Sequence, residues 1–557
     1  MTDLYSKERD ILRRILAAIL LVSPLLVGGC ELSGRSRDMA RLEAAGLTPD
    51  RAAMAEFVFG DFGGLSGTAL ETNALPFKVV CVAMLTAAEA PGETLGRADL
   101  PRLFGRYGFV FPQRMANWEG AQPKFQLPIG MVSAELGAFP GVRIEAANMS
   151  CAACHAGVLY DAQGRPTRDV WLGLPNSSLN LETYTRAVYD GLRLSSRDRD
   201  RFGRRIESTY PEMGWRERLT LRWLLLPRIE RRLSVLESTL RSPAPFSNGG
   251  AGRTNGVGSL KNQLGLLDRA SYHPDIGTTS IPALAFRGFR SSLLYDGCYA
   301  VPGEPRFVAR AAADDTPSHR DALAAIVAFF TVPIMGVTPE RAERSIPEAR
   351  RVMGFLSRTT PPRFPGAVDE SLVPRGRGVY EHRCAGCHGV YAGNSRPFRL
   401  IAFPNRLIAQ SDMGTDSSRW HDIDSPLISR LEHSVMARHV AADRTGGYVA
   451  PILSGLWATA PYLHNGSVPT VWHLMHPEAR PARFQVGGHR LDFDRMGIAG
   501  TPDSAGDYRY PAGYRPWTEP ELYDNRRPGL SNRGHVREFI GLDLADERAL
   551  LEFLKCL

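Results

Sequence analysis

Asn-Met-Ser-Cys-Ala-Ala-Cys-His, at residues 148–155, is the stretch that decides the fold. Two thiols three positions apart, followed directly by a histidine, allow one turn of chain to attach a haem through both vinyl groups while the imidazole ligates the iron. The pattern returns as Cys-Ala-Gly-Cys-His at residues 384–388. A single Cys-x-x-Cys would also fit half a zinc site or a redox pair, but two complete copies, each with its histidine, favour haem.

We therefore predict a c-type cytochrome with two covalently bound haem c groups. The attachment and ligand residues are Cys151, Cys154 and His155 for the first haem, and Cys384, Cys387 and His388 for the second. Of the eight cysteines, these motifs use four. Cys81, Cys298 and Cys556 have no predicted role, and the sequence leaves open whether two of them pair.

The length and charge of the chain limit its organisation and partners. At 557 residues it is long enough for two or three domains, each with its own core. The net charge of +8 is spread along the sequence, so we do not expect nucleic acid as a partner. An acidic electron donor or a lipid surface would fit this charge, and so would a generally soluble basic surface.

The N-terminus has the pattern of a targeting signal. Basic residues precede a mostly apolar run at 15–27, which is short for a membrane span, and Gly-Gly-Cys ends at Cys30. This ending resembles the lipobox of bacterial lipoproteins, which implies removal of residues 1–29 and acylation of Cys30. An ordinary signal peptide or an uncleaved anchor would also fit. Each alternative places the folded protein outside the cytoplasm, in the periplasm or at the cell surface, and a lipobox would make it an outer-membrane lipoprotein.

Periodicity and proline placement predict a mainly α-helical protein with extensive loops. It would contain an N-terminal wrapping region at 30–139, a first cytochrome c-like haem domain at 140–362 and a second at 363–557. Prolines around residue 362 mark the boundary, because they exclude a continuing helix. The arginine-rich span at 196–240 predicts solvated helices, with a docking or membrane-surface helix as the alternative. Helices are expected at 39–56, 76–89, 179–193, 321–331 and 546–554.

Four motifs together resemble the bacterial di-haem cytochrome c peroxidase superfamily, and most closely its rubber oxygenase-like branch. They are Cys-Ala-Ala-Cys-His-Ala-Gly at 151–157, Tyr-Asp-Gly at 295–297, Ala-Pro-Tyr-Leu-His-Asn-Gly-Ser at 460–467 and Ser-Asn-Arg-Gly-His at 531–535. The resemblance covers most of the chain beyond the N-terminal signal. It implies two unequal haems, one with an open iron and one that is six-coordinate and relays electrons.

Carried over, the resemblance implies that His155 ligates the reactive haem and His388 the relay haem. His535 would be the second ligand of the relay iron. His464 is a rival for that position, and a third alternative uses the later pair Met475 or His476.

The loop with the Tyr-Asp-Gly motif carries the implied catalytic residues. Relatives have a tryptophan before Asp-Gly as an electron relay, and this chain has Tyr295 there. Glu304 falls where peroxidases of the group place an acidic residue over the open iron, where it would move a proton between the peroxide oxygens. The distal phenylalanine of rubber oxygenases has no clear match, since Phe307 is offset and Arg310 lies nearer the expected position.

These features predict an oxidoreductase that activates peroxide or dioxygen at the first haem, with electrons passing through the second. Expected partners are a small redox donor protein or a quinone-linked chain, a peroxide, dioxygen or organic substrate, and a membrane through the lipid anchor. A pure electron-transfer cytochrome with two six-coordinate haems is the alternative, and a haem-based sensor is a third. Calcium is common between the domains of peroxidase relatives, although no acidic cluster in this sequence demands it.

Overall fold

The computed structural model of the chain describes residues 34–66, 75–139, 142–239, 248–267 and 272–557. Helix accounts for 41% of these residues and strand for 15%, the strands being distributed over many small sheets. The prediction of a mainly α-helical protein made of two cytochrome c-like haem domains is therefore wrong. Segments such as 156–160 and 166–172, rich in Val, Tyr, Thr and Trp and interrupted by turns, pair as strands instead of forming loops around separate helical units.

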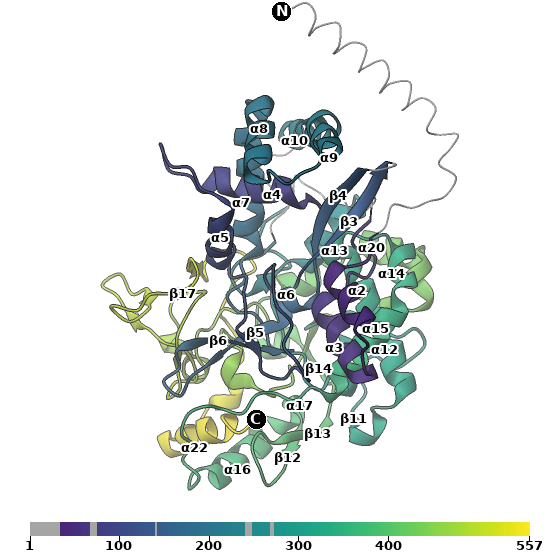
Figure 1. Cartoon of the computed structure of the whole chain (residues 1–557). Helices are drawn as coiled ribbons and strands as arrows, with labels where there is room; N and C mark the ends of the chain where they lie inside the picture. Colours follow the sequence, from purple (N-terminus) through teal and green to yellow (C-terminus); the bar gives the residue numbers. More distant parts are fainter. Residues whose placement is uncertain (1–33, 67–74, 140–141, 240–247, 268–271) are drawn as a thin grey trace, which may run out of the picture.

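Helices form most of the periphery of the molecule (Figure 1). Before the first haem motif lie α2 (Arg37–Ala44), α3 (Pro49–Phe59), α4 (Phe77–Ala88) and α5 (Leu100–Arg106). Between the motifs lie α7 (Leu181–Ser196), α8 (Arg199–Thr209), α9 (Trp215–Thr220), the π-helix η4 (Leu221–Leu225), α10 (Leu226–Thr239), α11 (Gly256–Gln263), α12 (Pro317–Phe329), α13 (Thr331–Met335), α14 (Pro339–Arg344), α15 (Ile346–Arg358) and α16 (Val373–Arg383). After the second motif come α18 (Gln410–Met413), α19 (Ser418–His421), α20 (Ser425–Glu432), α21 (Val471–Met475) and α22 (Leu544–Leu554).

The strands form small sheets of two to four strands in the described residues. Around the first motif are the sheet β1-β4-β3 (Leu75–Pro76, Val142–Met149, Met131–Phe139) and the sheet β2-β6-β5 (Arg114–Met115, Pro166–Leu172, Ala156–Tyr160). In the middle are β7-β8 (Arg253–Thr254, Thr279–Ser280), β15-β10-β9 (Ala441–Ala442, Tyr299–Ala300, Ser292–Leu293) and β14-β16 (Leu407–Ala409, Gly447–Val449). The C-terminal half adds β11-β13-β12 (Arg310–Ala311, Arg399–Phe403, Val390–Ala392), β20-β21-β17-β22 (Thr501–Pro502, Tyr508–Arg509, Arg483–Val486, Glu521–Asp524) and β18-β19 (Leu491–Asp492, Gly497–Ile498).

The helices expected from periodicity are confirmed, with shifted ends. The region 39–56 is divided into α2 and α3, and 76–89, 179–193, 321–331 and 546–554 correspond to α4, α7, α12 and α22. Helix α22 begins where the Asp543 side chain accepts a hydrogen bond from the amide of Asp546 at 2.7 Å, which satisfies one of the free donors of its first turn. The expected domain limits at residues 139 and 362 stay a prediction.

Helix α16 leads directly into the second motif and packs against α22. A Cβ atom on Gly376 would lie 1.9 Å from the carbonyl oxygen of Ala549, so only glycine permits this close approach. The contact fixes the helix that delivers Cys384. The beginning of the second motif is thus positioned by the C-terminal helix of the chain.

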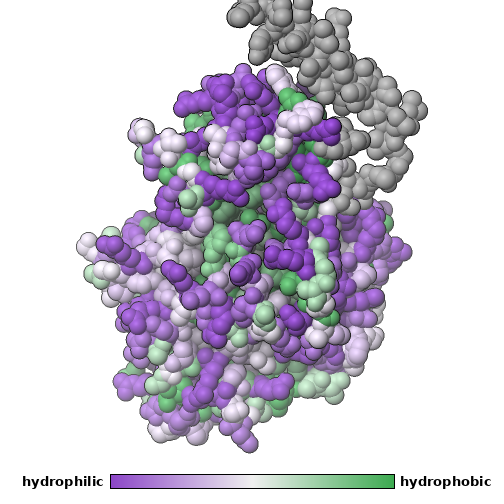
Figure 2. Space-filling model, in the orientation of Figure 1, coloured by the Kyte–Doolittle hydropathy of each residue, from purple (hydrophilic) through white to green (hydrophobic). Residues whose placement is uncertain are grey.

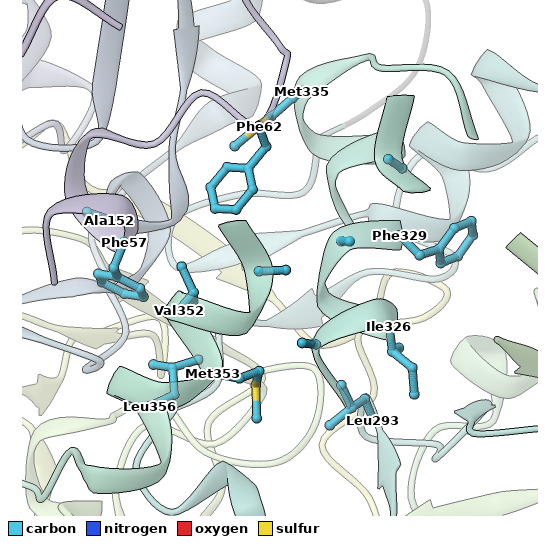
Figure 3. Close-up of a cluster of buried hydrophobic side chains, with 14 of the residues drawn as sticks. Phe57, Phe62, Ala152, Leu293, Ile326, Phe329, Met335, Val352, Met353 and Leu356 are labelled. Carbon is cyan, nitrogen blue, oxygen red and sulfur yellow. The ribbon is translucent and has the colours of Figure 1, made fainter. Parts of the chain in front are cut away.

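A large apolar cluster joins the first haem motif to the surrounding helices. Figure 3 shows Ala152 of the first motif next to Phe57 of α3, with Val352 and Leu356 of α15 on the same side. The run Pro317–Met335, formed by α12 and α13, is long and apolar enough to cross a membrane by length and composition alone. More than half of it is buried in the protein, and its apolar character is accounted for by packing in this cluster.

The arginine-rich span forms helices α8, α9, η4 and α10 at one end of the molecule (Figure 1). This end is largely hydrophilic on the face shown in Figure 2, in keeping with a solvated helical region. Trp215, 67% exposed, and Leu219, 41% exposed, are its outward apolar side chains. The inner side of α9, η4 and α10 reaches the central cavity described below.

Candidate haem-binding cavity

Both haem motifs line one continuous cavity of about 1830 Å³. Its walls include all six motif residues: Cys151, Cys154, His155, Cys384, Cys387 and His388. Most of the remaining wall is apolar, with side chains from α7, η4 and α10 near the first motif and from α21 and α22 near the second. Two motifs far apart in the sequence therefore serve a single interior space.

The first motif is the short helix α6 (Cys151–His155), which follows directly after β4. Ser150 Oγ donates to the Val58 carbonyl oxygen at 2.6 Å, and this ties the start of α6 to α3. At its end, the Cys154 and His155 carbonyl oxygens accept backbone hydrogen bonds from Asn176 and Gly173, at 2.7 and 2.8 Å. The backbone of the attachment site is thus held at both ends by buried partners.

A glycine makes room for this helix. Gly130 has a φ of +80°, and a Cβ at this residue would lie 1.9 Å from the amide nitrogen of Ala153. Its carbonyl oxygen accepts a hydrogen bond from the Ser150 amide at 2.7 Å. Any larger residue would displace the turn that carries the two thiols.

The imidazole of His155 is oriented by the backbone. Its Nδ1 lies 3.1 Å from the Pro282 carbonyl oxygen, and because a carbonyl only accepts, Nδ1 carries the proton. Burial, reinforced by the nearby Arg287 charge, lowers the pKa of His155 to about 3, so the ring is neutral at physiological pH. Nε2 is then the unprotonated nitrogen, which is the state a metal ligand requires.

The second motif repeats this arrangement. Cys384 ends α16, and the one-turn helix α17 (Ala385–His388) follows. Nδ1 of His388 lies 2.9 Å from the Pro451 carbonyl oxygen, and burial lowers the pKa of His388 to about 4. Tyr380 Oη donates to the Gly389 carbonyl oxygen at 2.9 Å and holds the turn that follows. Each motif thus presents two thiols and one neutral imidazole fixed through its Nδ1 to a proline carbonyl, which fits covalently attached haem.

His535 lies next to His388 in the cavity. Their ring centroids are 6.1 Å apart with an interplanar angle of 39°. Two imidazoles that bind one metal from opposite sides, each at roughly 2.0 Å, have ring centroids roughly 6 Å apart. The His535 backbone has a φ of +50°, and its amide donates to the Met413 carbonyl oxygen at 3.0 Å, which fixes this uncommon conformation.

The side chain of His535 has two further neighbours: the ring of Phe539, stacked at a centroid distance of 5.4 Å, and the carboxylate of Glu538. Its Nδ1 lies 3.7 Å from Glu538 Oε2, and neither atom has a hydrogen-bond partner among the described residues. Burial lowers the pKa of His535, so its ring is also neutral. A neutral imidazole with a carboxylate close to Nδ1 resembles the outer environment of metal-bound histidines.

The rival ligands lie elsewhere. His464 lines the cavity, but its ring stacks on Tyr448 with centroids 4.1 Å apart. His476 stacks on Trp472 at 4.3 Å, and Met475 is buried in the second apolar cluster. Neither Met475 nor His476 belongs to the described cavity wall. The structure therefore brings His535, rather than the later pair, next to His388.

Tyr295 lines the cavity at the end of β9. Its hydroxyl lies 2.9 Å from Ser280 Oγ, and burial raises its pKa. The Ser280 amide donates to the His464 carbonyl oxygen at 2.8 Å. Ser280 therefore connects the loop that carries Tyr295 to the segment that contains His464. Tyr295 stays neutral at physiological pH, and losing an electron would require its proton to move.

Glu304 is not part of this arrangement. Its side chain is 47% exposed and pairs with Arg310, the two charged groups being 3.6 Å apart. It is not among the described residues of the cavity wall. Phe307 packs against the second apolar cluster beside Gly297. The structure thus separates Glu304 from Tyr295 and the motif histidines.

A buried ion pair, which the sequence did not indicate, anchors the loop that carries the Tyr-Asp-Gly motif. Asp296, with a fully buried side chain, lies 3.2 Å from the guanidinium of Arg419, which is 4% exposed. Asp296 also accepts a hydrogen bond from the Cys298 amide at 3.3 Å. The acidic residue of the Tyr-Asp-Gly motif therefore holds the loop in place.

We expect Asp296→Ala to lower the free energy of unfolding by about 3–5 kcal/mol, because it leaves the buried Arg419 charge without a partner. Guanidinium unfolding of the haem-loaded protein measures this. Glu304→Ala removes the exposed acidic residue of the same loop and is the matched control, with an expected change within about 0.5 kcal/mol. Equal effects of the two substitutions would contradict the assigned role of Asp296.

Two arginines of the cavity wall were also missed. Arg287 and Arg290 belong to Phe-Arg-Gly-Phe-Arg at 286–290, and both line the cavity. Arginines placed between phenylalanines were the signal that could have identified them, since charges in an apolar stretch are rarely buried without a reason.

A segment in the C-terminal half of the chain is similar to a known protein family. Residues 447–485 match a protein family described as RoxA-like, cytochrome c-like. The matched segment contains Pro451, whose carbonyl holds His388, and His464. The match supports a likeness to the rubber oxygenase-like cytochrome c family, and with it a c-type cytochrome with covalently bound haem c.

Two curated relatives come from Sinorhizobium fredii (strain NBRC 101917 / NGR234). The uncharacterized protein y4iM is 33% identical over 207 residues, 34% of this chain and 46% of the relative. The uncharacterized protein y4iJ is 28% identical over 233 residues, 31% of this chain and 36% of the relative. The chain thus spans less than half the length of these relatives.

The remaining predictions concern the N-terminal segment, the three cysteines outside the motifs, and a bound metal ion. Cys30 and the whole of residues 1–29 lie outside the described residues. Cys81, Cys298 and Cys556 are buried and free, so these three form no disulfide with one another. Within the described part of the chain, no group of three or more His, Cys, Asp or Glu residues is placed to hold a metal ion.

Proposed function

We propose that the protein is a di-haem c-type cytochrome oxidoreductase that activates peroxide or dioxygen at the first motif and receives electrons through the second. One observation carries the proposal, namely the unequal surroundings of the two motif histidines. His388 has His535 with its ring centroid 6.1 Å away. Among the described residues, no aromatic or histidine ring contacts the ring of His155.

In this proposal Cys151 and Cys154 attach the reactive haem, and His155 ligates its iron. His388 and His535 together ligate the relay iron. When bound, the haems supply one-electron redox chemistry, and an iron ligated on one side only has a position for a small oxidant. An iron ligated by two histidines has no such position, which suits electron transfer.

The other residues of the wall position these groups and exclude water. The Pro282 and Pro451 carbonyl oxygens fix the two imidazoles in the tautomer that ligates through Nε2. Ser280 holds the hydroxyl of Tyr295 in the wall of the same cavity. The mostly apolar wall beside the first motif would exclude water from the haem site.

The cellular setting belongs to the proposal as well. The basic N-terminal segment, the apolar run and Cys30 support a lipid-anchored protein outside the cytoplasm, where c-type haem is attached. An electron donor in that compartment would be a small redox protein or a quinone-linked chain. The basic net charge of the sequence would favour an acidic donor surface.

Spectroscopy of the intact protein tests the proposal. We expect two haems per chain, one high-spin and one low-spin in the ferric state, and we expect carbon monoxide to bind one haem per chain after reduction. Electron paramagnetic resonance and an optical titration measure both quantities. Two low-spin irons that bind neither carbon monoxide nor cyanide would overturn the proposal in favour of a pure electron-transfer cytochrome.

A further inference from the structure

Arg287 and Arg290 place two positive charges in the wall of an apolar cavity. Arg290 is 2% exposed, and Arg287 is half-buried within the wall. They lie at the two ends of the segment Arg287-Gly-Phe-Arg290, in which residues 287–289 form the 3₁₀ turn η5. The preceding Phe286 has a left-handed backbone with a φ of +57°. The turn brings both guanidinium groups to the same wall.

The donors of the two arginines are used differently. Arg290 donates through Nε to the Ser292 carbonyl oxygen and through Nη2 to that of Leu294, both at 3.0 Å, and through Nη1 to that of Ala450 at 3.4 Å. Each of its two Nη atoms keeps one further N–H donor. Arg287 donates through Nη2 to the Ala283 carbonyl oxygen, and its buried Nε has no partner among the described residues. A guanidinium has five N–H donors, so Arg287 keeps donors available toward the cavity.

Among the described residues, no carboxylate forms an ion pair with Arg287 or Arg290, although the more distant Asp296, which pairs with Arg419, partly offsets the Arg290 charge. Burial lowers the pKa of Arg287 to about 10, and burial together with the Arg287 charge lowers that of Arg290 to about 9. Both side chains remain charged at neutral pH. Arg419, another arginine of this wall, has the carboxylate of Asp296 at 3.2 Å. One half-buried and one buried guanidinium, neither in an ion pair of its own, favour an anion bound in the cavity.

Arg287 lies on the side of the first motif. Its guanidinium donates to the Ala283 carbonyl oxygen, and the preceding residue, Pro282, accepts the hydrogen bond from His155 Nδ1. The Arg287 charge also lowers the pKa of His155. The residue that orients the first imidazole and the residue that binds Arg287 are thus neighbours in the chain.

We infer that Arg287 and Arg290 form a carboxylate-binding subsite of the cavity that holds the propionate groups of the haem attached at Cys151 and Cys154. The inference rests on the proposed haem occupancy. Arginine suits this role, because its planar fork donates two parallel hydrogen bonds to one carboxylate. The carboxylate in turn compensates for the desolvation of the two guanidinium groups.

The experiment uses the full-length, haem-loaded protein and measures the midpoint potential of each haem. In Arg287→Gln an uncompensated propionate charge favours the oxidised iron, so we expect the potential of the ligand-binding haem to fall. A tenfold change in the redox equilibrium constant corresponds to about 59 mV for one electron. We expect a decrease of about this size for that haem and a smaller change for the other.

Three further variants complete the test. Arg287→Lys keeps the charge but loses the planar fork, so we expect an intermediate shift, and it provides a second reading if Arg287→Gln fails to fold. Arg290→Gln should shift the potential in the same direction. Arg438→Gln removes an exposed arginine that pairs with Glu343, and it should leave both potentials unchanged.

A free carboxylate, such as an organic acid substrate, could occupy the same subsite, and benzoate distinguishes this source. If Arg287→Gln leaves both potentials unchanged but abolishes a benzoate-induced spectral change of the intact protein, the assignment to propionate is overturned. Unchanged potentials without any effect of benzoate would overturn the subsite itself. Because the potentials are measured without turnover, either result leaves the proposed activation of peroxide or dioxygen to its own test.

Discussion

In His535→Ala we expect the low-spin ferric signal to disappear and carbon monoxide to bind two haems per chain instead of one. The reason is the position of His535, whose ring centroid lies 6.1 Å from that of His388. In our proposal His388 and His535 would both hold the relay haem, so removing one imidazole would make its iron accessible to a small ligand. Turnover that depends on electrons from the relay should fall on the order of 100-fold, as for other losses of groups that hold a metal centre.

His464→Ala and His476→Ala are the matched controls, because both residues were candidates for the same position. His464 lines the cavity and His476 does not, and in the described part of the chain neither ring pairs with that of His388, as the ring of His535 does. We expect the low-spin signal to persist in both. If it disappears in His464→Ala and persists in His535→Ala, His464 is the ligand and the assignment made here is wrong.

Glu538→Gln provides a graded variant of the same test. Glu538 Oε2 lies 3.7 Å from His535 Nδ1, and the other carboxylate oxygen, Oε1, lies 3.8 Å from Nε of the exposed Arg537. The substitution keeps the shape of the side chain and removes its negative charge. We expect ligation to persist and the potential of the relay haem to rise, because a carboxylate near Nδ1 stabilises the ferric state.

The features that sequence could predict are local ones. Cys-x-x-Cys-His is a covalent requirement satisfied within five residues, so both motifs were identifiable without knowledge of the fold. The helices α4, α7, α12 and α22 follow from apolar periodicity. These predictions depend only on neighbours along the chain.

The features that sequence did not predict depend on distant parts of the chain. The two motifs are more than 200 residues apart, and nothing local indicates that both line one cavity. Separate helical haem domains were expected because each motif was interpreted alone. The strands between them are short, and whether such segments pair is decided by tertiary contacts rather than by their own propensity.

Charged residues show the same limit. Glu304 was selected by its offset from the Tyr-Asp-Gly motif, and the structure places it 47% exposed beside Arg310. Arg287 and Arg290, which line the cavity, were not selected. Burial of a charge is a property of the assembled structure, so an offset within a loop could not separate these cases.

Replacing both thiols of one motif tests the division of roles between the haems. In the double variant Cys151→Ala with Cys154→Ala we expect haem content to fall from two to one per chain, and the remaining haem to be low-spin. Carbon monoxide binding and reaction with peroxide should both be lost, because the remaining iron is ligated by two histidines in our proposal. A haem assay, optical titration and stopped-flow measurements check the three results.

The reciprocal variant, Cys384→Ala with Cys387→Ala, should keep one high-spin haem that still binds carbon monoxide, while electron-dependent turnover is lost. Cys81→Ala is the control, since Cys81 is buried away from the cavity wall, and it should keep both haems. If the first double variant keeps the ligand-binding haem and the reciprocal variant loses it, the roles of the two motifs are reversed. Such a reversal would leave the shared cavity intact but would make the surroundings of His388, rather than those of His155, the place where the oxidant reacts.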